Sequence, residues 1–555
     1  MIASNLLEKF PENSIPRTQQ KETLNKLSSF FQSSKKFAVC CLPTGSGKSH
    51  IAMACAMATN EIDNQRKDLI ESYEIYKQKN DEVPSIENIF EENYPYGAFI
   101  LTVTKNLQDQ YKGLFENSIL LKGRNNYQCE VDPSTTVDSA PCIFVPDLKK
   151  KCFSQNKCPY YNSRKKGFIN KDTITNYRAY FSFPDFLKKR EVLICDEASN
   201  LEEEIVSFYG VTITYSTLKA EDISFKKIIT DDPTEAYRWL NDIYIQVSNS
   251  LVDLQQKFAL LKQKKSSNFE GLLQKMGSRF SKLSRLSCSL TNVIDNWLEC
   301  EYIIESKSAH EVTFVPLNIK PLAQQMFSRA DKIILMSATI SNHQEFTKML
   351  GISREDYSYI EMPSPFKAER SPIICSTKYN LSYQSMEKTL PYILDMVVEI
   401  CKNHQGEKGL IHTHTHNITQ ALRKKIKNNS RFLFREPGSS NEDIISLHKN
   451  STETDTIIVS PSLDSGVSLD DDLGRFQIII KAPFLPLGSK RIKKIFDKNP
   501  EYYMSKMLDT LVQMCGRCTR SSEDYSTTYI LDGTAVKAIK KYKDKMPRHF
   551  LDRFK

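Results

Sequence analysis

The chain has 555 residues, more than one hydrophobic core can organise, so its length predicts several domains. Hydrophobic residues make up 40% and charged residues 26%, and no apolar run is long enough to span a bilayer, which argues against a membrane-spanning protein. The first residues do not resemble a signal peptide, so we expect a cytoplasmic protein. The net charge of +9 permits a polyanionic partner but does not require one.

Residues 42–49, Leu-Pro-Thr-Gly-Ser-Gly-Lys-Ser, have the pattern of a phosphate-binding loop, although Leu replaces the first glycine. An apolar run at 37–42 predicts a buried strand before the loop, and 51–57 predicts a helix after it. Glycines let backbone N–H groups face a phosphate, and the helix N-terminus adds positive partial charge. We expect Lys48 to reach the β- and γ-phosphates and the Ser49 hydroxyl to bind Mg²⁺. The predicted nucleotide-binding residues of the loop are Thr44, Gly45, Ser46, Gly47, Lys48 and Ser49.

Two segments on either side of the loop add to this prediction. Gln20 precedes the loop in an Arg-x-x-Gln pattern, and its amide could face an adenine edge, or it could simply begin a polar helix. Residues 61–97 are polar and acidic and predict an insertion without chemistry. A strand at 98–104 then ends in Thr, and a helix is expected from Lys105. A helix N-terminus beside such a strand end suits contact with a nucleic-acid backbone.

A second apolar strand, 192–195, ends in the carboxylates Asp196 and Glu197. Downstream of a phosphate loop, Asp196 can hold Mg²⁺ and Glu197 can polarise the water that attacks the γ-phosphate. A further buried strand ends in Ser337-Ala338-Thr339. After residue 345 the αβ alternation repeats, which predicts a second nucleotide-fold domain without its own phosphate loop.

Four cysteines, Cys129, Cys142, Cys152 and Cys158, cluster in a polar segment that also holds basic runs and tyrosines. Four thiolates could hold a tetrahedral Zn²⁺ or an iron–sulfur cluster. The spacing lacks the paired Cys-x2-Cys of zinc ribbons, which disfavours zinc. Four unrelated thiols remain an alternative, although the clustering weakens it.

Two patterns in the last third of the chain bear on function. His412, His414 and His416 alternate, so they would share one face of a strand; we favour a strand end that lines a cleft over a metal site. Cys515 and Cys518 have the spacing of a redox or metal-binding pair. They lie, however, inside the pattern Gln513-x-x-Gly516-Arg517-x-x-Arg520, which explains these positions better. Residues 206–310 are largely helical in pattern, with basic patches that could meet nucleic acid.

The order of these motifs resembles that of a superfamily 2 helicase, and the four-cysteine insertion resembles the XPD/DinG family of iron–sulfur helicases. The segments that carry the narrower resemblance are Gly123–Cys129, Cys158–Tyr161, Thr175–Tyr177, Pro316–Leu317 and Pro483–Phe484. It extends from about Arg17 to Asp532.

The resemblance implies an α/β fold with two RecA-like parallel-sheet motor domains, and iron–sulfur and helical arch-like insertions in the first. It implies ATP and Mg²⁺ as cofactors, a [4Fe–4S] cluster on the four cysteines, and 5′→3′ movement of a monomer on single-stranded and 5′-tailed duplex DNA. Arg124 matches a family position near the cluster and the DNA path. Gln513, Arg517 and Arg520 would act on ATP from the second domain, the arginines as fingers on the γ-phosphate, and Gly466 would contact the nucleotide. The implied parts are 1–120, 171–205 and 312–345 for the first motor domain, 121–170 for the cluster domain, 206–311 for the arch and 346–555 for the second motor domain.

Two departures from the family pattern keep other functions open. Ser199 replaces the histidine of the Asp-Glu-Ala-His box, and residues 465–468 read Ser-Gly-Val-Ser where the family has Glu-Gly-x-Asp. The first departure bears on how hydrolysis is coupled to movement. The alternatives are an ATP-switched DNA-binding or assembly factor with little unwinding, and a helicase acting on RNA or RNA–DNA hybrids.

Overall fold

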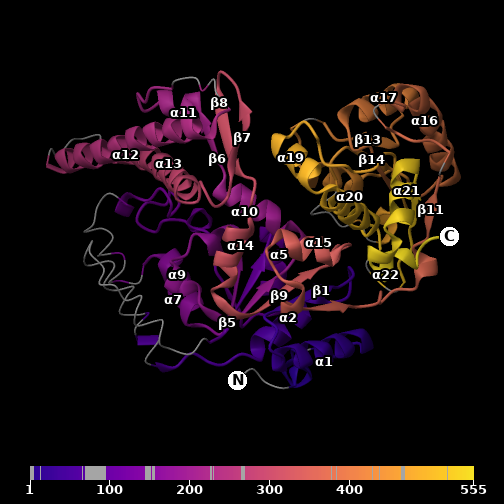
Figure 1. Ribbon diagram of the computed structural model, residues 1–555, viewed down its shortest axis with the longest axis horizontal. Helices are drawn as coiled ribbons and strands as arrows, with labels where there is room; N and C mark the ends of the chain where they lie inside the picture. The colour runs from indigo at the N-terminus through magenta and orange to yellow at the C-terminus, as the bar shows by residue number, and fades with distance from the viewer. Residues whose placement is uncertain are drawn as a thin grey trace.

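The computed structural model of the chain consists of two α/β units and a helical arm that stands on the first unit (Figure 1). The N-terminal unit and the arm are coloured from indigo through magenta to salmon pink, and the C-terminal unit from orange to yellow. The structure describes residues 5–12, 14–64, 67–68, 70, 96–143, 152, 155, 157–225, 228, 231–263, 269–376, 378–382, 384–427, 429–436, 438–463, 469, 471–519, 521 and 523–555. Most of the acidic insertion predicted at 61–97 lies outside these residues.

The first unit is built on a seven-stranded parallel sheet of order β10-β1-β9-β5-β2-β4-β3. Its central strands are buried on both faces, which explains their almost uninterrupted apolar sequences. The strands are β1 (Phe37–Cys41), β2 (Ala98–Thr102), β3 (Ile119–Leu120), β4 (Asp172–Asn176), β5 (Arg190–Cys195), β9 (Ala330–Ser337) and β10 (Tyr357–Glu361). The helices of this unit are α1 (Thr18–Gln32), α2 (Lys48–Met57), α5 (Lys105–Leu114), α7 (Pro159–Ile169), α8 (Tyr177–Phe181), α9 (Asp185–Lys188), α10 (Leu201–Tyr209), α14 (Lys320–Phe327) and α15 (His343–Met349).

The second unit is built on a six-stranded parallel sheet of order β11-β16-β15-β12-β14-β13. Two parallel sheets with helices on their faces confirm the predicted α/β class with two RecA-like domains. The strands are β11 (Ile373–Cys375), β12 (Gly409–His412), β13 (Phe432–Phe434), β14 (Ile457–Ser460), β15 (Phe476–Ile479) and β16 (Thr527–Ile530). The helices are α16 (Met386–Asn403), α17 (His416–Ile426), α18 (Asn441–Asn450), α19 (Lys490–Lys498), α20 (Pro500–Cys515), α21 (Gly533–Lys541) and α22 (Arg548–Leu551).

The arm combines a long helical hairpin with a small antiparallel sheet of order β6-β8-β7. The hairpin is formed by α12 (Pro233–Gln263) and α13 (Phe269–Asp295). The sheet contains β6 (Val211–Thr214), β7 (Tyr302–Lys307) and β8 (Glu311–Pro316), and α11 (Tyr215–Lys219) follows β6. Of the helices that the structure describes, none has both the length and the apolar character needed to cross a bilayer.

Two strands lie in sheets other than those expected from the sequence. The segment from residue 312 was expected to return to the first motor domain, but β8 pairs with β6 and β7 in the arm. Residues 346–555 were expected to form the second motor domain, but β10 pairs with β1 in the first sheet, with Phe37 opposite Tyr357. The local pattern of a strand predicts its conformation but does not identify its partner, and the partner determines the unit to which it belongs.

A buried cluster of charged groups joins the two units beside the ends of their sheets. Glu202 of α10 pairs with Arg491 of α19 at 2.8 Å and with Lys506 of α20 at 3.5 Å, and it accepts a hydrogen bond from the Tyr502 hydroxyl. Burial alone raises the pKa of the Glu202 carboxyl, but Arg491 and Lys506 outweigh burial and lower that pKa to about 2. The cluster therefore holds α20, which leads into Gln513 and Arg517, against the segment that follows Asp196 and Glu197.

Candidate active site

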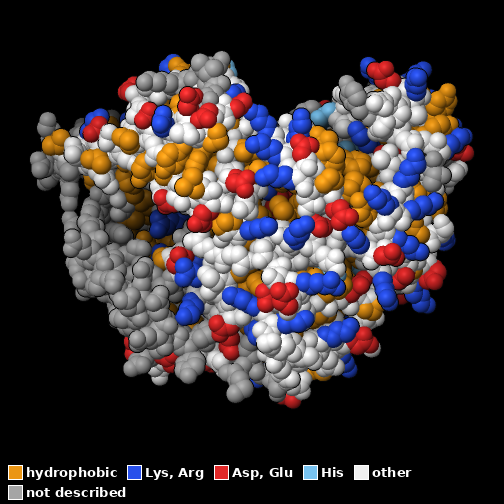
Figure 2. All heavy atoms as spheres, in the orientation of Figure 1, with side chains coloured by type: hydrophobic (Ala, Val, Ile, Leu, Met, Phe, Trp, Pro, Cys, Tyr) orange, Lys and Arg blue, Asp and Glu red, His pale blue; other side chains and the backbone are white. Residues whose placement is uncertain are grey.

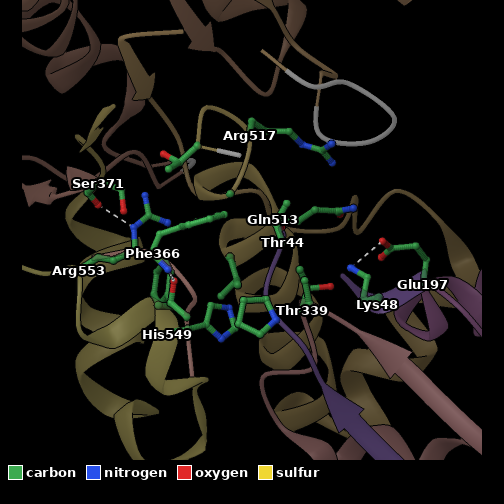
Figure 3. Close-up of a pocket in the computed structure, with 17 residues that line it drawn as sticks. Thr44, Lys48, Glu197, Thr339, Phe366, Ser371, Gln513, Arg517, His549 and Arg553 are labelled. Carbon is green, nitrogen blue, oxygen red and sulfur yellow. Dashed lines mark hydrogen bonds and ion pairs between the residues drawn. The ribbon is translucent and has the colours of Figure 1, made fainter. Parts of the chain in front are cut away.

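A cleft lies between the two units and is lined by residues of both (Figure 3). The predicted residues Thr44, Lys48, Glu197, Gln513 and Arg517 all face it. In the close-up, Lys48 and Glu197 lie at one end of the cleft, Ser371 and Arg553 at the other, and Gln513, Thr44 and Thr339 between them. The remaining lining residues are Pro43, Ala338, Ser364, Phe366, Val512, Gly516, Thr519, His549 and Phe550.

The loop between β1 and α2 adopts the conformation that its glycines allow. Gly45 and Gly47 have φ values of 75° and 77°, in the left-handed region that favours glycine. A Cβ atom at position 47 would lie 2.3 Å from the Gln20 amide nitrogen, so a side chain there would displace the Gln20 amide. Lys48 begins α2 directly after this turn, and its Nζ lies 3.1 Å from Glu197 Oε1.

Asp196 and Glu197 occupy the end of β5, next to the loop. The Asp196 carboxylate is buried and accepts hydrogen bonds from the Tyr111 hydroxyl and the Glu197 backbone N–H, both at 2.9 Å. Burial first, and the Glu197 charge second, raise the pKa of Asp196 to about 6. A bound cation would favour the ionised carboxylate. Glu197 has a φ of 51°, a backbone conformation that non-glycine residues rarely adopt and that recurs at functional sites.

The second unit brings its arginine to the cleft through the end of α20. A Cβ atom at Gly516 would lie 3.4 Å from the Thr44 hydroxyl, which shows how closely the two units approach. Arg517 follows and is buried. His412, at the end of β12, is buried beside it, and burial together with the Arg517 charge lowers the pKa of His412 to about 3. His412 is therefore neutral near this arginine at physiological pH.

The three alternating histidines do not share one strand. β12 ends at His412, the Nε2 atom of His414 lies 3.1 Å from the Phe484 carbonyl oxygen, and His416 is an exposed residue at the start of α17.

Ser199 takes part in contacts between the two units. Its hydroxyl lies 3.0 Å from the Ser337 hydroxyl and 3.2 Å from the Thr339 hydroxyl. Its backbone carbonyl accepts a hydrogen bond from Lys506 Nζ of α20 at 3.2 Å. The serine that replaces the family histidine thus still connects the Asp-Glu segment with the Ser-Ala-Thr strand end.

Other predicted residues lie near the cleft but do not line it. Gln20 is buried; its Oε1 accepts from the Arg17 N–H at 2.9 Å, and its Nε2 contacts the Gly47 carbonyl at 3.5 Å. These contacts agree with the second of the two interpretations of Gln20, a polar residue at the start of a helix, rather than with an adenine contact. Gly45, Ser46, Gly47, Ser49 and Asp196 belong to the loop and strand end beside the cleft, whereas Gly466 and Arg520 lie outside the described residues.

Two groups of residues near the site had no signal in the sequence. Tyr111 is an aromatic residue of α5 in the first unit, and its hydroxyl reaches a carboxylate far along the chain. His549 and Arg553 come from the C-terminal end of the second unit. Arg553 donates to the carbonyls of Ser371 at 2.7 Å and Cys515 at 3.0 Å, so it holds the end of α20 from which Arg517 emerges.

The four clustered cysteines line one small pocket, apart from the cleft. Cys129 is buried, Cys142 lies in a short 3₁₀ helix (Pro141–Ile143), and Cys158 caps the N-terminus of α7. Burial chiefly raises the pKa of Cys152, and the Cys129 and Cys158 thiols raise it further. Arg124 is close enough to Cys158 to lower the pKa of that thiol, against the stronger effect of burial. Within the described part of the chain, no three or more His, Cys, Asp or Glu side chains form a group that could hold a metal ion.

Comparisons with known proteins agree with this geometry. Residues 397–553 match the family model of the helicase C-terminal domain. Similar solved structures include an XPD helicase and an XPD in its apo form, each 15% identical, with a TM-score of 0.55 over 95% of this chain and 98% of that chain. The chain has the XPD helicase fold. Xpd4 from S. tokodaii shares it at 13% identity and a TM-score of 0.51, again over 95% of this chain and 98% of that chain. The sequence matches no curated protein.

The XPD-like fold is the fold that the resemblance to XPD/DinG-like superfamily 2 helicases implies. The matched helicase C-terminal domain covers most of the second unit, including α20, Arg517 and the C-terminal helix α22. The match to the helicase C-terminal domain supports a helicase, a class of enzyme that uses a nucleotide and Mg²⁺.

Proposed function

We propose that the protein is an ATP-driven DNA helicase that moves 5′→3′ along single-stranded DNA. The observation that carries the proposal is one cleft lined by Lys48 and Glu197 of the first unit and by Gln513 and Arg517 of the second. A site divided between two units changes shape when its ligand is split, and that change can drive movement. The division into motor, cluster and arch segments is part of this proposal, with β8 assigned to the arm and β10 to the first motor domain.

The cleft residues suit the hydrolysis of ATP. Lys48 and the loop N–H groups would hold the β- and γ-phosphates, and Ser49 and Asp196 would hold Mg²⁺, which supplies charge neutralisation when bound. Glu197 would release Lys48 to the phosphates and orient a water molecule. As the water oxygen bonds to the γ-phosphorus, the bond to the bridging oxygen breaks, ADP leaves, and Glu197 accepts the water proton. Arg517 and Arg520 would stabilise the negative charge that develops on the transferred group, with Gln513 and Gly466 contacting the nucleotide.

Ser199 supports coupling between hydrolysis and movement. Its hydroxyl meets Ser337 and Thr339, and its carbonyl meets Lys506 of α20. A movement of the segment that holds Asp196 and Glu197 can therefore be passed to α20 of the second unit through the hydrogen bonds of Ser199. These contacts favour a coupled motor over an assembly factor that merely switches with ATP.

Several basic surfaces suit a nucleic-acid track. Figure 2 shows a notch between the arm and the second unit, with Lys and Arg side chains gathered on its walls. Lys493 and Lys494 of α19 are exposed at the end of the second unit that faces β7. Charge contacts to phosphates bind without sequence preference, which suits a translocating enzyme.

For the four cysteines we propose a [4Fe–4S] cluster. Four thiols around one cavity are the donor set that such clusters use, and their surroundings hold the cation of Arg124. A single tetrahedral metal ion would need its thiolates at about 2.3 Å from one centre. The four positions lack the paired Cys-x2-Cys spacing of zinc ribbons, which favours the cluster. The cluster would brace the segment between β3 and β4, which contacts α13 of the arm.

The substrate is tested with tailed duplexes and ATP. We expect strand displacement from 5′-tailed DNA and little from 3′-tailed DNA, because the two units would step in one direction along the strand. The matched duplexes should have identical sequence and tail length. Preference for the 3′ tail would reject the polarity, RNA that outcompetes DNA would favour the hybrid or RNA helicase, and ATP hydrolysis without displacement would favour the ATP-switched factor.

The cluster is tested by elemental analysis of anaerobically purified protein. We expect about four iron atoms per chain and a broad visible absorbance that is lost in Cys129→Ser. The control is Cys288→Ser, since Cys288 is an exposed thiol of α13 outside the cavity. One zinc per chain without iron would overturn the proposal.

A further inference from the structure

The cleft extends beyond the residues that we assign to the phosphates and Mg²⁺. Phe366 and His549 also line it, and in Figure 3 they lie in the half of the cleft away from Lys48. A nucleoside triphosphate carries its ribose and base at one end of the phosphate chain. With the phosphates at Lys48, this second half of the cleft is a place where the nucleoside can lie.

Phe366 supplies an aromatic face in this half of the cleft. It lies in the connection between β10, the last strand of the first sheet along the chain, and β11, the first strand of the second. Its backbone N–H donates to the Ser364 hydroxyl at 3.1 Å, and its side chain is partly exposed. An aromatic side chain that is open to a cleft can stack on the face of a base.

His549 reaches the same half of the cleft from α22. Burial chiefly, and the charges of Arg553 and Lys48 in addition, lower the pKa of its imidazole to about 3, so the ring is neutral at physiological pH and has one N–H. Its Nδ1 atom is enclosed and has no hydrogen-bond partner among the described residues. Because an unpaired N–H is rarely buried, we assign the proton to Nε2. The side chain is partly exposed, which leaves Nε2 as the nitrogen that can donate to a ligand.

Contacts with both units fix the helix that carries His549. The Arg548 N–H donates at 2.6 Å to Oε1 of Glu361, the last residue of β10. The Arg553 guanidinium donates at 3.0 Å to the carbonyl of Cys515, the last residue of α20. The imidazole is therefore held in place before any ligand arrives, which lowers the entropic cost of binding.

The start of α1, beside the phosphate loop, is the other place where a base could lie. There the Gln20 amide is engaged at both ends, by the Arg17 N–H and by the Gly47 carbonyl. The Arg17 guanidinium donates to the Gly45 carbonyl at 2.9 Å. These polar groups support the loop itself, whereas Phe366 and His549 present an aromatic face and a donor to the cleft.

We propose that Phe366 and His549 form the nucleoside end of the cleft and bind a purine base, Phe366 by stacking on its face and His549 by donating from Nε2 to a ring nitrogen. The N7 atom is an acceptor that adenine and guanine share. The pair therefore selects purines without distinguishing one purine from the other. The inference rests on the proposed function, because it assumes that the phosphates lie at Lys48.

The test compares the binding of ADP and of pyrophosphate, each with Mg²⁺, by calorimetry. Pyrophosphate has no nucleoside, so its affinity reports the phosphate site and the integrity of the fold. In Phe366→Ala we expect ADP to bind about 10-fold more weakly, because a stacking face is lost. In His549→Ala we expect a loss of about fivefold, the effect of one neutral hydrogen bond. Pyrophosphate should bind equally well in both variants, and Phe366→Tyr, which keeps the aromatic face, should restore ADP binding.

The matched control is Tyr392→Ala, which removes an exposed aromatic ring from α16 and should change neither affinity. GDP should bind the unaltered protein about as well as ADP does, and CDP more weakly. Equal binding of CDP and ADP would overturn the selection of purines.

Three outcomes would overturn the nucleoside site itself. These are an unchanged ADP affinity in Phe366→Ala and His549→Ala, an equal loss of pyrophosphate affinity, and an unaltered protein that binds ADP no better than pyrophosphate. A loss of ADP binding alone in Gln20→Ala, with Phe366→Ala unaffected, would place the base at α1. If the unaltered protein binds neither ADP nor pyrophosphate, the proposed function fails instead.

Discussion

Lys48→Ala is expected to reduce ATP hydrolysis, with or without single-stranded DNA, by more than about 10³-fold. Lys48 begins α2, lies 3.1 Å from Glu197 and faces the cleft, so it is the cation that would bind the phosphates most directly. Its removal leaves the transferred phosphate without this positive charge and leaves Glu197 without its ion-pair partner. The rate of phosphate release measures the effect.

A matched control distinguishes a lost site from a damaged fold. Lys26→Ala removes an exposed lysine from α1 of the same unit and should leave the rate unchanged. The thermal unfolding midpoint should be similar in both variants, because Lys48 is partly exposed at the rim of the cleft. Retained turnover in Lys48→Ala would mean that the loop is not the phosphate site.

Arg517→Ala is expected to lower kcat for ATP hydrolysis by about 10³-fold while ATP binding weakens far less. Arg517 belongs to the second unit and lines the cleft opposite Lys48, so it meets the phosphates only when the two units close. It would then stabilise charge that appears in the transition state and not in bound ATP, and such groups affect kcat more than affinity.

Two further variants sharpen this prediction. Arg517→Lys keeps the charge but loses the planar fork, so it should recover only a small part of kcat. Arg354→Ala removes an exposed arginine of the first unit and should change neither kcat nor KM. A loss of ATP affinity in Arg517→Ala equal to its loss of kcat would contradict a role confined to the transition state.

Much of the cleft could be predicted because its residues form motifs with local physical signatures. A glycine turn between a strand and a helix, and a carboxylate pair after an apolar strand, each require only neighbouring residues. The structure brings Lys48 and Glu197 to one cleft, as these signatures predict, and Arg517 lines the same cleft, as the resemblance to helicases implies. The two parallel sheets were predictable for the same reason, since apolar strands alternating with helices indicate such sheets.

The remaining features depend on partners distant in the chain. The sequence marks Tyr111 only as an aromatic residue of a helix, because its partner Asp196 is 85 residues away. The sheet to which β10 belongs follows from its pairing with β1, which no local pattern encodes. Gln20 shows the opposite case: its chemistry suits adenine, but the fold directs its amide to the backbone of Arg17 and Gly47.

The central claim is that both units act on one ATP molecule, and the most direct test is a structure of the full chain with Mg²⁺, ADP and a metal fluoride that mimics the transferred phosphate. We expect the fluoride group between Lys48 and Arg517, with Mg²⁺ on Ser49 and Asp196 and a water molecule beside Glu197. A nucleotide bound to the loop with Arg517 turned away from the fluoride, or bound elsewhere on the chain, would contradict this account.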